Sequence, residues 1–158
     1  MKPNKIKICG ITDLSIANFC IDNDADYLGF VSYEHSPRNI SLHDSKDIIS
    51  KLSKPIDTVA VTVNANINDI KEIEDSGFNY IQLHGSEDLS YLGAIKKNTQ
   101  LKIIKAFGIS TQADFNNVND YSDLCDYFLL DAKPEETEMP GGNAKKFDWS
   151  LLGGQNLK

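Results

Sequence analysis

The stretch KIKICGITD, residues 5–13, has the pattern of a short strand that ends at a cysteine and a glycine. Alternation along a strand places Lys7 and Cys9 on one face, and Ile6 and Ile8 on the other. The isoleucine face is suited to packing against a layer of helices. We therefore expect Cys9 on the opposite, more polar face, at the C-terminal end of the strand.

The same change from strand to helix recurs along the whole chain. Five more strand-like apolar runs occupy residues 27–31, 58–63, 80–84, 101–107 and 127–132. An amphipathic segment of helical length follows each of the first five strands. The first has its apolar positions at Leu14, Ala17 and Ile21. The others occupy residues 41–52, 66–77, 86–97 and 111–121. FDWSLL, residues 147–152, is typical of the start of a sixth helix. Thr12 or Asp13 can cap the first helix, and Gly77 is placed to end the third.

This strict alternation predicts right-handed βαβ crossovers and a parallel sheet. Two α/β architectures satisfy the pattern, an open doubly wound sheet and a (β/α)₈ TIM barrel. The first strand is followed by a single glycine and lacks the G-x-G-x-x-G pattern, which removes the usual reason to prefer a dinucleotide-binding sheet. In a barrel, the active site forms at the C-terminal strand ends. Chemically capable residues gather at those positions: Cys9, Arg38, Asn64, Gln82, His84 and Asp131.

Composition narrows the class of protein. A chain of 158 residues fits one domain, and its net charge of −7 argues against nucleic acid as a partner. The three cysteines, Cys9, Cys20 and Cys125, form no C-x-x-C pair, which argues against a structural zinc site or a disulfide framework. Because the sequence shows neither a long apolar run nor a secretory signal, we expect a cytoplasmic protein without a membrane partner.

Four motifs in chain order resemble phosphoribosylanthranilate isomerase of tryptophan biosynthesis. They are KICGIT at 7–12, SPR at 36–38, QLHG at 82–85, and LLDAKP with PGGNAKKFDWSLL within 129–152. The resemblance extends over essentially the whole chain. It implies a (β/α)₈ barrel with no metal or organic cofactor. The implied reaction is the Amadori rearrangement of N-(5-phosphoribosyl)anthranilate, a phosphorylated aminosugar, to 1-(2-carboxyphenylamino)-1-deoxyribulose 5-phosphate.

By this resemblance, Cys9 is the general base and Asp131 the general acid. The chemistry needs such a pair, because ring opening requires a proton on the ring oxygen and moving the carbonyl requires removal of a proton from the neighbouring carbon. Arg38 is the sole arginine and is expected to bind the anthranilate carboxylate through paired donors. Gln82 and His84 are expected to contact the substrate as well.

The segment MPGGN, residues 139–143, resembles the family's loop after the sixth strand. Gly141 and Gly142 would offer backbone N–H groups to the sugar or phosphate. Ala144 departs from the family pattern, because another glycine is common at that position. A need for positive φ there would strain this chain's loop.

A second departure concerns the number of units. The sequence supplies about six βα units where the barrel has eight, so we expect residues 1–158 to form a single incomplete barrel domain that lacks the seventh and eighth units. The phosphate-binding residues are expected in those missing units. The 158-residue chain is therefore expected to be inactive alone. Nothing in the sequence sets the oligomeric state.

Two other functions remain open at this level. A different sugar-phosphate barrel, such as an epimerase or an indole-glycerol-phosphate synthase relative, would need metal ligands or a lysine–glutamate pair at several strand ends, and the strands do not show such a set. Alternatively, the chain is a non-catalytic module or one part of a split barrel, completed by a second segment.

Overall fold

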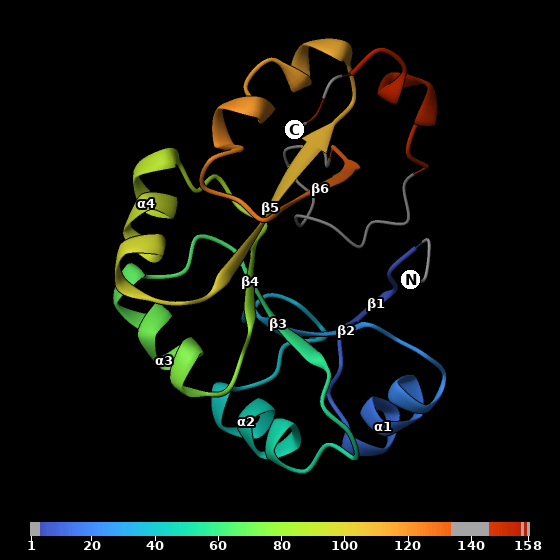
Figure 1. The fold of residues 1–158 in the computed structure, drawn as a ribbon, viewed down its shortest axis with the longest axis vertical. Helices are drawn as coiled ribbons and strands as arrows, with labels where there is room; N and C mark the ends of the chain where they lie inside the picture. Colours follow the sequence, from blue (N-terminus) through green and yellow to red (C-terminus); the bar gives the residue numbers. More distant parts are fainter. Residues whose placement is uncertain (1–3, 134–145, 156, 158) are drawn as a thin grey trace.

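The computed structural model describes residues 4–133, 146–155 and 157 (Figure 1). Within these residues, six parallel strands form one sheet in the order β1-β2-β3-β4-β5-β6. The strands are β1 (Lys7–Cys9), β2 (Tyr27–Ser32), β3 (Asp57–Thr62), β4 (Tyr80–Leu83), β5 (Lys102–Ile109) and β6 (Tyr127–Ala132). Neighbours in the chain are neighbours in the sheet, so the order never reverses as it must in a doubly wound sheet. The described residues form a partial TIM barrel of six parallel strands, where a complete barrel has eight.

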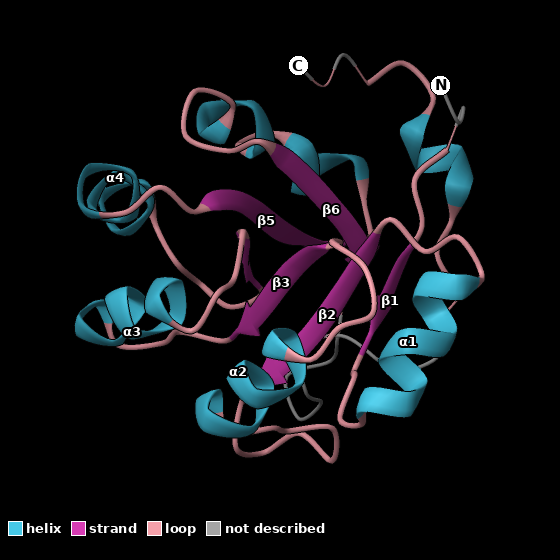
Figure 2. Cartoon of the chain, turned by 60° about the horizontal axis from the view of Figure 1, so that its bottom comes forward, coloured by secondary structure: helices cyan, strands magenta, loops and turns pink. Residues whose placement is uncertain are grey.

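The helices lie on the outer side of the curved sheet, as Figure 2 shows. The α-helices are α1 (Leu14–Asp22), α2 (Leu42–Ser50), α3 (Ile70–Asp75) and α4 (Leu89–Asn98). Short 3₁₀ helices are η1 (Ile67–Asp69), η2 (Gln112–Phe115), η3 (Val118–Tyr121) and η4 (Trp149–Leu152). Among the described helices, none combines the length and the apolar character needed to cross a membrane.

Local sequence signals explain where these helices begin and end. Asp13 caps α1, because its carboxylate accepts hydrogen bonds from the N–H groups of Ser15 and Ile16. This settles the choice that the sequence left between Thr12 and Asp13. Gly77 follows α3 with a φ of 93°, which confirms its predicted role as a helix-ending glycine.

The helix predicted at 111–121 is wrong in type. The segment folds as the two 3₁₀ helices η2 and η3, and the expected start of a helix at 147–152 is likewise the single 3₁₀ helix η4. Residues 111–121 are rich in asparagine and aspartate, whose side chains compete with the helical backbone for hydrogen bonds. Asp114 accepts hydrogen bonds from the N–H groups of Ser110 and Thr111, which fixes a tight turn at this point.

Alternating residues bury both faces of the sheet. The outer face packs against the helices through residues such as Leu28, Phe30, Ala60, Ile81, Leu83 and Ile103. The inner face forms a second apolar cluster from Tyr27, Val31, Val59, Val61, Tyr80 and Ile104. In each strand, the residues that alternate with the outward-facing ones point to the barrel interior, on the same face as this inner cluster. Interior side chains near the C-terminal strand ends therefore lie next to an apolar cluster.

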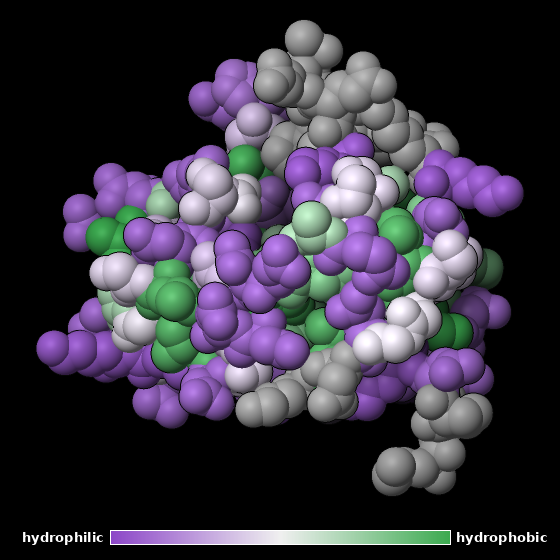
Figure 3. All heavy atoms as spheres, turned by 90° about the horizontal axis from the view of Figure 1, so that it is seen from above, coloured by the Kyte–Doolittle hydropathy of each residue, from purple (hydrophilic) through white to green (hydrophobic). Residues whose placement is uncertain are grey.

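β1 and β6 lie at the two ends of the curved sheet (Figure 1), and each pairs with one described neighbour. Exposed large apolar side chains gather beside both: Ile6, Ile8, Ile16 and Phe19 near β1, and Tyr127 and Trp149 near β6. The isoleucine face of β1 is thus partly exposed, although the sequence suggested a covering helix layer. Figure 3 shows another face, where hydrophilic residues surround small hydrophobic patches. Among the described residues, no strand pairs β1 with β6, so the described sheet has an opening between these two strands.

Candidate active site

The structure brings the described candidate residues to one edge of the sheet. Cys9 is the last residue of β1, and Asp131 is the next-to-last residue of β6. Gln82 lies in β4, His84 directly follows that strand, and Arg38 lies in the loop between β2 and α2. Since parallel strands end on the same side, all five residues face the C-terminal edge of the partial barrel. The predicted substrate-binding residues Gly141 and Gly142 lie outside the described residues.

Cys9 is exposed and faces the barrel interior beside a lysine. It pairs with Gly29 of β2 in the sheet register. A Cβ atom built on Gly29 would lie 2.9 Å from the Cys9 Sγ and 3.2 Å from the Lys7 Nζ. The thiol and the ammonium group therefore lie over the same glycine, and any larger residue there would push them aside. This confirms the face that alternation predicted for Cys9.

Arg38 reaches the end of β1 by packing over a second glycine. Gly10 directly follows Cys9 and has a φ of 92°, a conformation that side chains rarely adopt. A Cβ atom on Gly10 would lie 2.6 Å from the Cδ of Arg38, so a larger residue would force the arginine side chain to shift. The sequence Cys9–Gly10 therefore places the thiol at the strand end and leaves room for the guanidinium stem next to it.

Asp131 faces a histidine that comes from the middle of the sheet. Its Oδ2 lies 3.7 Å from the Nε2 of His84, and its Oδ1 accepts a hydrogen bond of 2.8 Å from the N–H of Ala132. The Nδ1 of His84 lies 3.0 Å from the Nε2 of Gln82. Burial lowers the pKa of His84 from its ordinary value, so the imidazole is neutral near pH 7.

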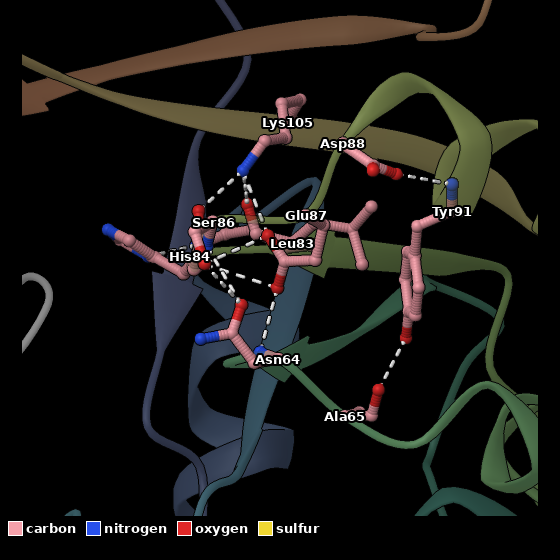
Figure 4. Close-up of polar contacts among 11 residues, drawn as sticks. Asn64, Ala65, Leu83, His84, Ser86, Glu87, Asp88, Tyr91 and Lys105 are labelled. Carbon is pink, nitrogen blue, oxygen red and sulfur yellow. Dashed lines mark hydrogen bonds and ion pairs between the residues drawn. The ribbon is translucent and has the colours of Figure 1, made fainter.

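A buried ion pair supports this edge of the site (Figure 4). The Nζ of Lys105 lies 2.9 Å from the Oε2 of Glu87, and both side chains are almost fully buried, at 4% and 1% exposed. Lys105 also donates a 2.7 Å hydrogen bond to the carbonyl of Gly85. Glu87 accepts hydrogen bonds from the N–H groups of Asn64, at 2.9 Å, and Gly85, at 3.0 Å. The pair therefore links the ends of β3 and β4 to the middle of β5.

Sequence reasoning did not select this pair. Strand alternation alone does not decide whether Lys105 points to the interior or to solvent, and Glu87 belongs to no sequence motif that indicates a buried charge. The position of Lys105 in an apolar strand was the available signal, since a buried lysine requires an acidic partner. Asn64, with a φ of 48°, sits in a tight turn whose backbone Glu87 holds.

A solvent-open pocket of about 260 Å³ lies between the two outer strands, towards their N-terminal ends and away from the edge that carries Cys9 and Asp131. It is lined by Lys5, Lys7, Tyr27, Ile104, Tyr127, Phe128 and Leu129. These residues belong mainly to β1 and β6 or to the segment just before β1. Within the part of the chain that the structure describes, no group of three or more histidine, cysteine and acidic side chains is placed to hold a metal ion.

Comparisons with known proteins agree with this architecture. A family model described as N-(5′-phosphoribosyl)anthranilate isomerase matches residues 6–158. The isomerase of Petrotoga mobilis is 38% identical over 155 residues, which cover 98% of this chain and 72% of the relative. The isomerase of Rhizobium etli is 37% identical in an alignment that covers 96% of this chain and 69% of the relative. The chain thus spans about seven tenths of these two relatives.

Solved structures give the same result. The phosphoribosylanthranilate isomerase of Thermotoga maritima superposes with a TM-score of 0.81 at 36% identity, covering 94% of this chain and 69% of that one. A phosphoribosylanthranilate isomerase in complex with reduced 1-(o-carboxyphenylamino)-1-deoxyribulose 5-phosphate superposes with a TM-score of 0.78 at 33% identity, covering 94% of this chain and 68% of that one. With its six-stranded partial barrel and its ordered motifs, this chain belongs to the N-(5′-phosphoribosyl)anthranilate isomerase family.

Proposed function

We propose that Cys9 and Asp131 are the general base and general acid of the isomerisation of N-(5-phosphoribosyl)anthranilate, a cytoplasmic small-molecule reaction. The observation that carries this proposal is their placement. Both side chains face the interior at the C-terminal edge, on β1 and β6, the strands that flank the opening. An acid and a base on opposite sides of the sugar are what the reaction requires.

The proton transfers follow from these two positions. The Asp131 carboxylic acid protonates the furanose ring oxygen, the bond from that oxygen to the anomeric carbon breaks, and an open-chain iminium forms. The Cys9 thiolate then takes the proton from the neighbouring carbon, which gives an enolamine that tautomerises to the aminoketose. The Lys7 ammonium lies over the same glycine, Gly29, as the Cys9 sulfur.

Arg38 supplies the carboxylate recognition in this proposal. A guanidinium presents paired donors to a planar carboxylate, and the Arg38 side chain is held against Gly10 at the end of β1. The anthranilate ring would then lie on the β1–β2 side of the opening. The sugar would extend from there towards β6 and Asp131.

We further propose that the 158-residue chain is inactive until two more βα units close its sheet. Exposed apolar side chains beside both outer strands, such as Phe19 at 68% and Trp149 at 73% exposed, support this view. Barrels of this kind commonly bind phosphate through the loops after strands seven and eight. The same surfaces favour the split-barrel alternative, in which the closing segment is a separate polypeptide.

The test is a fluorescence assay for the loss of freshly generated phosphoribosylanthranilate. It compares the 158-residue chain, the chain fused to the two closing βα units of a relative, and the same units added in trans. Cys9→Ala and Asp131→Asn are introduced into the fused protein, with Cys20→Ala as a matched control away from the strand ends. We expect the fused protein to be active and the 158-residue chain to be inactive. Activity when the units are added in trans would indicate a split barrel. The Cys9→Ala and Asp131→Asn variants of the fused protein should lose activity. Activity that survives either site variant would refute the assigned roles.

A further inference from the structure

We propose that His84 is a positioning residue for Asp131 and that Gln82 sets its tautomer, so that a neutral imidazole presents its Nε2–H to the carboxylate. This inference deepens the proposed function and rests on Asp131 as the general acid. It assigns Gln82 and His84 to the acid itself, whereas the sequence motif suggested direct contacts with substrate.

The first step is the contact between Gln82 and His84. The amide nitrogen of Gln82 lies 3.0 Å from Nδ1, and an amide nitrogen is a donor only. With the amide in this orientation, Nδ1 accepts, and the single proton of the neutral ring is left on Nε2. Gln82 is 2% exposed and held within β4 between β3 and β5, so its amide has little freedom to move.

The second step is the contact between His84 and Asp131. Ala132 already donates its N–H to Oδ1 of Asp131, at 2.8 Å, while Oδ2 faces the Nε2 of His84 at 3.7 Å. That distance is longer than a hydrogen bond, as is common for catalytic contacts without substrate. A small rotation of the half-buried aspartate would close it. The carboxylate would then have a donor on each oxygen.

The third step is the charge state of the ring. Burial lowers the pKa of His84, and the nearby ammonium groups of Lys7 and Lys105 lower it further. The carboxylates of Asp131 and Glu87 act in the opposite direction and are outweighed. A neutral ring donates one hydrogen bond without competing for the catalytic proton. When Asp131 releases its proton to the sugar, the Nε2–H stabilises the carboxylate that remains.

The competing arrangement is a reversed Gln82 amide. Its oxygen would then accept a proton from Nδ1 of His84, and Nε2 would become an acceptor facing Asp131. As the amide stands, its buried oxygen has no hydrogen-bond partner among the described residues. The two arrangements place the ring proton on different nitrogens, and this difference is measurable.

The first experiment is long-range ¹H–¹⁵N NMR of the histidine rings in the 158-residue chain. The chain has three histidines, and the spectrum of His84→Asn identifies the signals of His84 by their loss. We expect a protonated Nε2 and an unprotonated Nδ1 from pH 7 to 8. Gln82→Met should yield a mixture of tautomers, whereas Gln100→Met, at an exposed position, should change nothing. The inference would be overturned if the proton of His84 lies on Nδ1, or if the Gln82→Met substitution leaves the position of that proton unchanged.

The second experiment measures kinetics in the fused, closed barrel. His84→Asn should lower kcat by about tenfold to hundredfold with KM changed less than twofold, and should move the alkaline limb of the kcat profile to higher pH. His84→Gln keeps an N–H near the position of Nε2 and should recover part of the loss. A change in KM alone would show substrate contact and refute positioning. An inactive fused wild type would refute the proposed function, and the tautomer measurement would still decide this inference.

Discussion

Removing the positive charge of Lys105 should destabilise the fold strongly. The perturbation is Lys105→Met, which keeps the length of the side chain but leaves the Glu87 carboxylate buried without its 2.9 Å ammonium partner. The remaining donors to Glu87 are the backbone N–H groups of Asn64 and Gly85. Breaking a buried ion pair from one side costs about 3–5 kcal/mol.

That loss is large against the total stability of an ordinary domain, which is about 5–15 kcal/mol. For a chain of this size, each kcal/mol lowers the Tm by about 2–4 °C, so the expected fall is about 6–20 °C. The assay is urea unfolding followed by circular dichroism, together with a thermal scan. Lys97→Met, the same substitution at an exposed position of α4, should change stability by less than about 0.5 kcal/mol.

The double variant Lys105→Met with Glu87→Gln separates charge from packing. Glutamine removes the uncompensated charge, so the double variant should be more stable than Lys105→Met alone. A loss below about 1 kcal/mol in Lys105→Met would refute the reasoning, because a buried carboxylate would then tolerate losing its partner. If the double variant loses as much free energy of unfolding as Lys105→Met and Glu87→Gln lose together, then packing, and not charge, stabilises this network.

Three further predictions follow from the structure. Gly10→Ala should destabilise the chain by about 1–2 kcal/mol, because Gly10 has a positive φ and the added methyl group would overlap the Arg38 side chain. As a control, Gly93→Ala, where α4 leaves open space, should stabilise the chain by about 0.5–1 kcal/mol. The urea unfolding assay measures both changes. Iodoacetamide should label the exposed Cys9 before Cys125, because burial raises the pKa of the Cys125 thiol to about 11, and peptide mass mapping reports the order. Asp114→Asn should flatten the loss of stability in acid, since a lysine ammonium and backbone N–H groups hold the pKa of that carboxyl below its usual value. Its stabilising effect is therefore present above the unfolded pKa of about 3.9 and lost as the pH falls further; a wild type and variant with parallel pH profiles would contradict this.

Much of the site was accessible from the sequence because strand ends are local features. Cys9 ends a run with period-two alternation, and Asp131 follows a continuous apolar run; in a parallel sheet such strand ends meet at one edge. The same reasoning located Arg38, Gln82 and His84 near the opening. It could not state which of them touch, because contacts between β4 and β6 depend on how far the sheet curves.

The sequence by itself determined the alternation of strands and helices, the parallel sheet and the face on which Cys9 lies. Each follows from hydrophobic periodicity and capping chemistry within a few residues. Only the tertiary structure decided that the strand order never reverses, that Lys105 and Glu87 form a buried pair, and that His84 faces Asp131. These depend on residues brought together across strands, where register and curvature set distances that no local pattern contains.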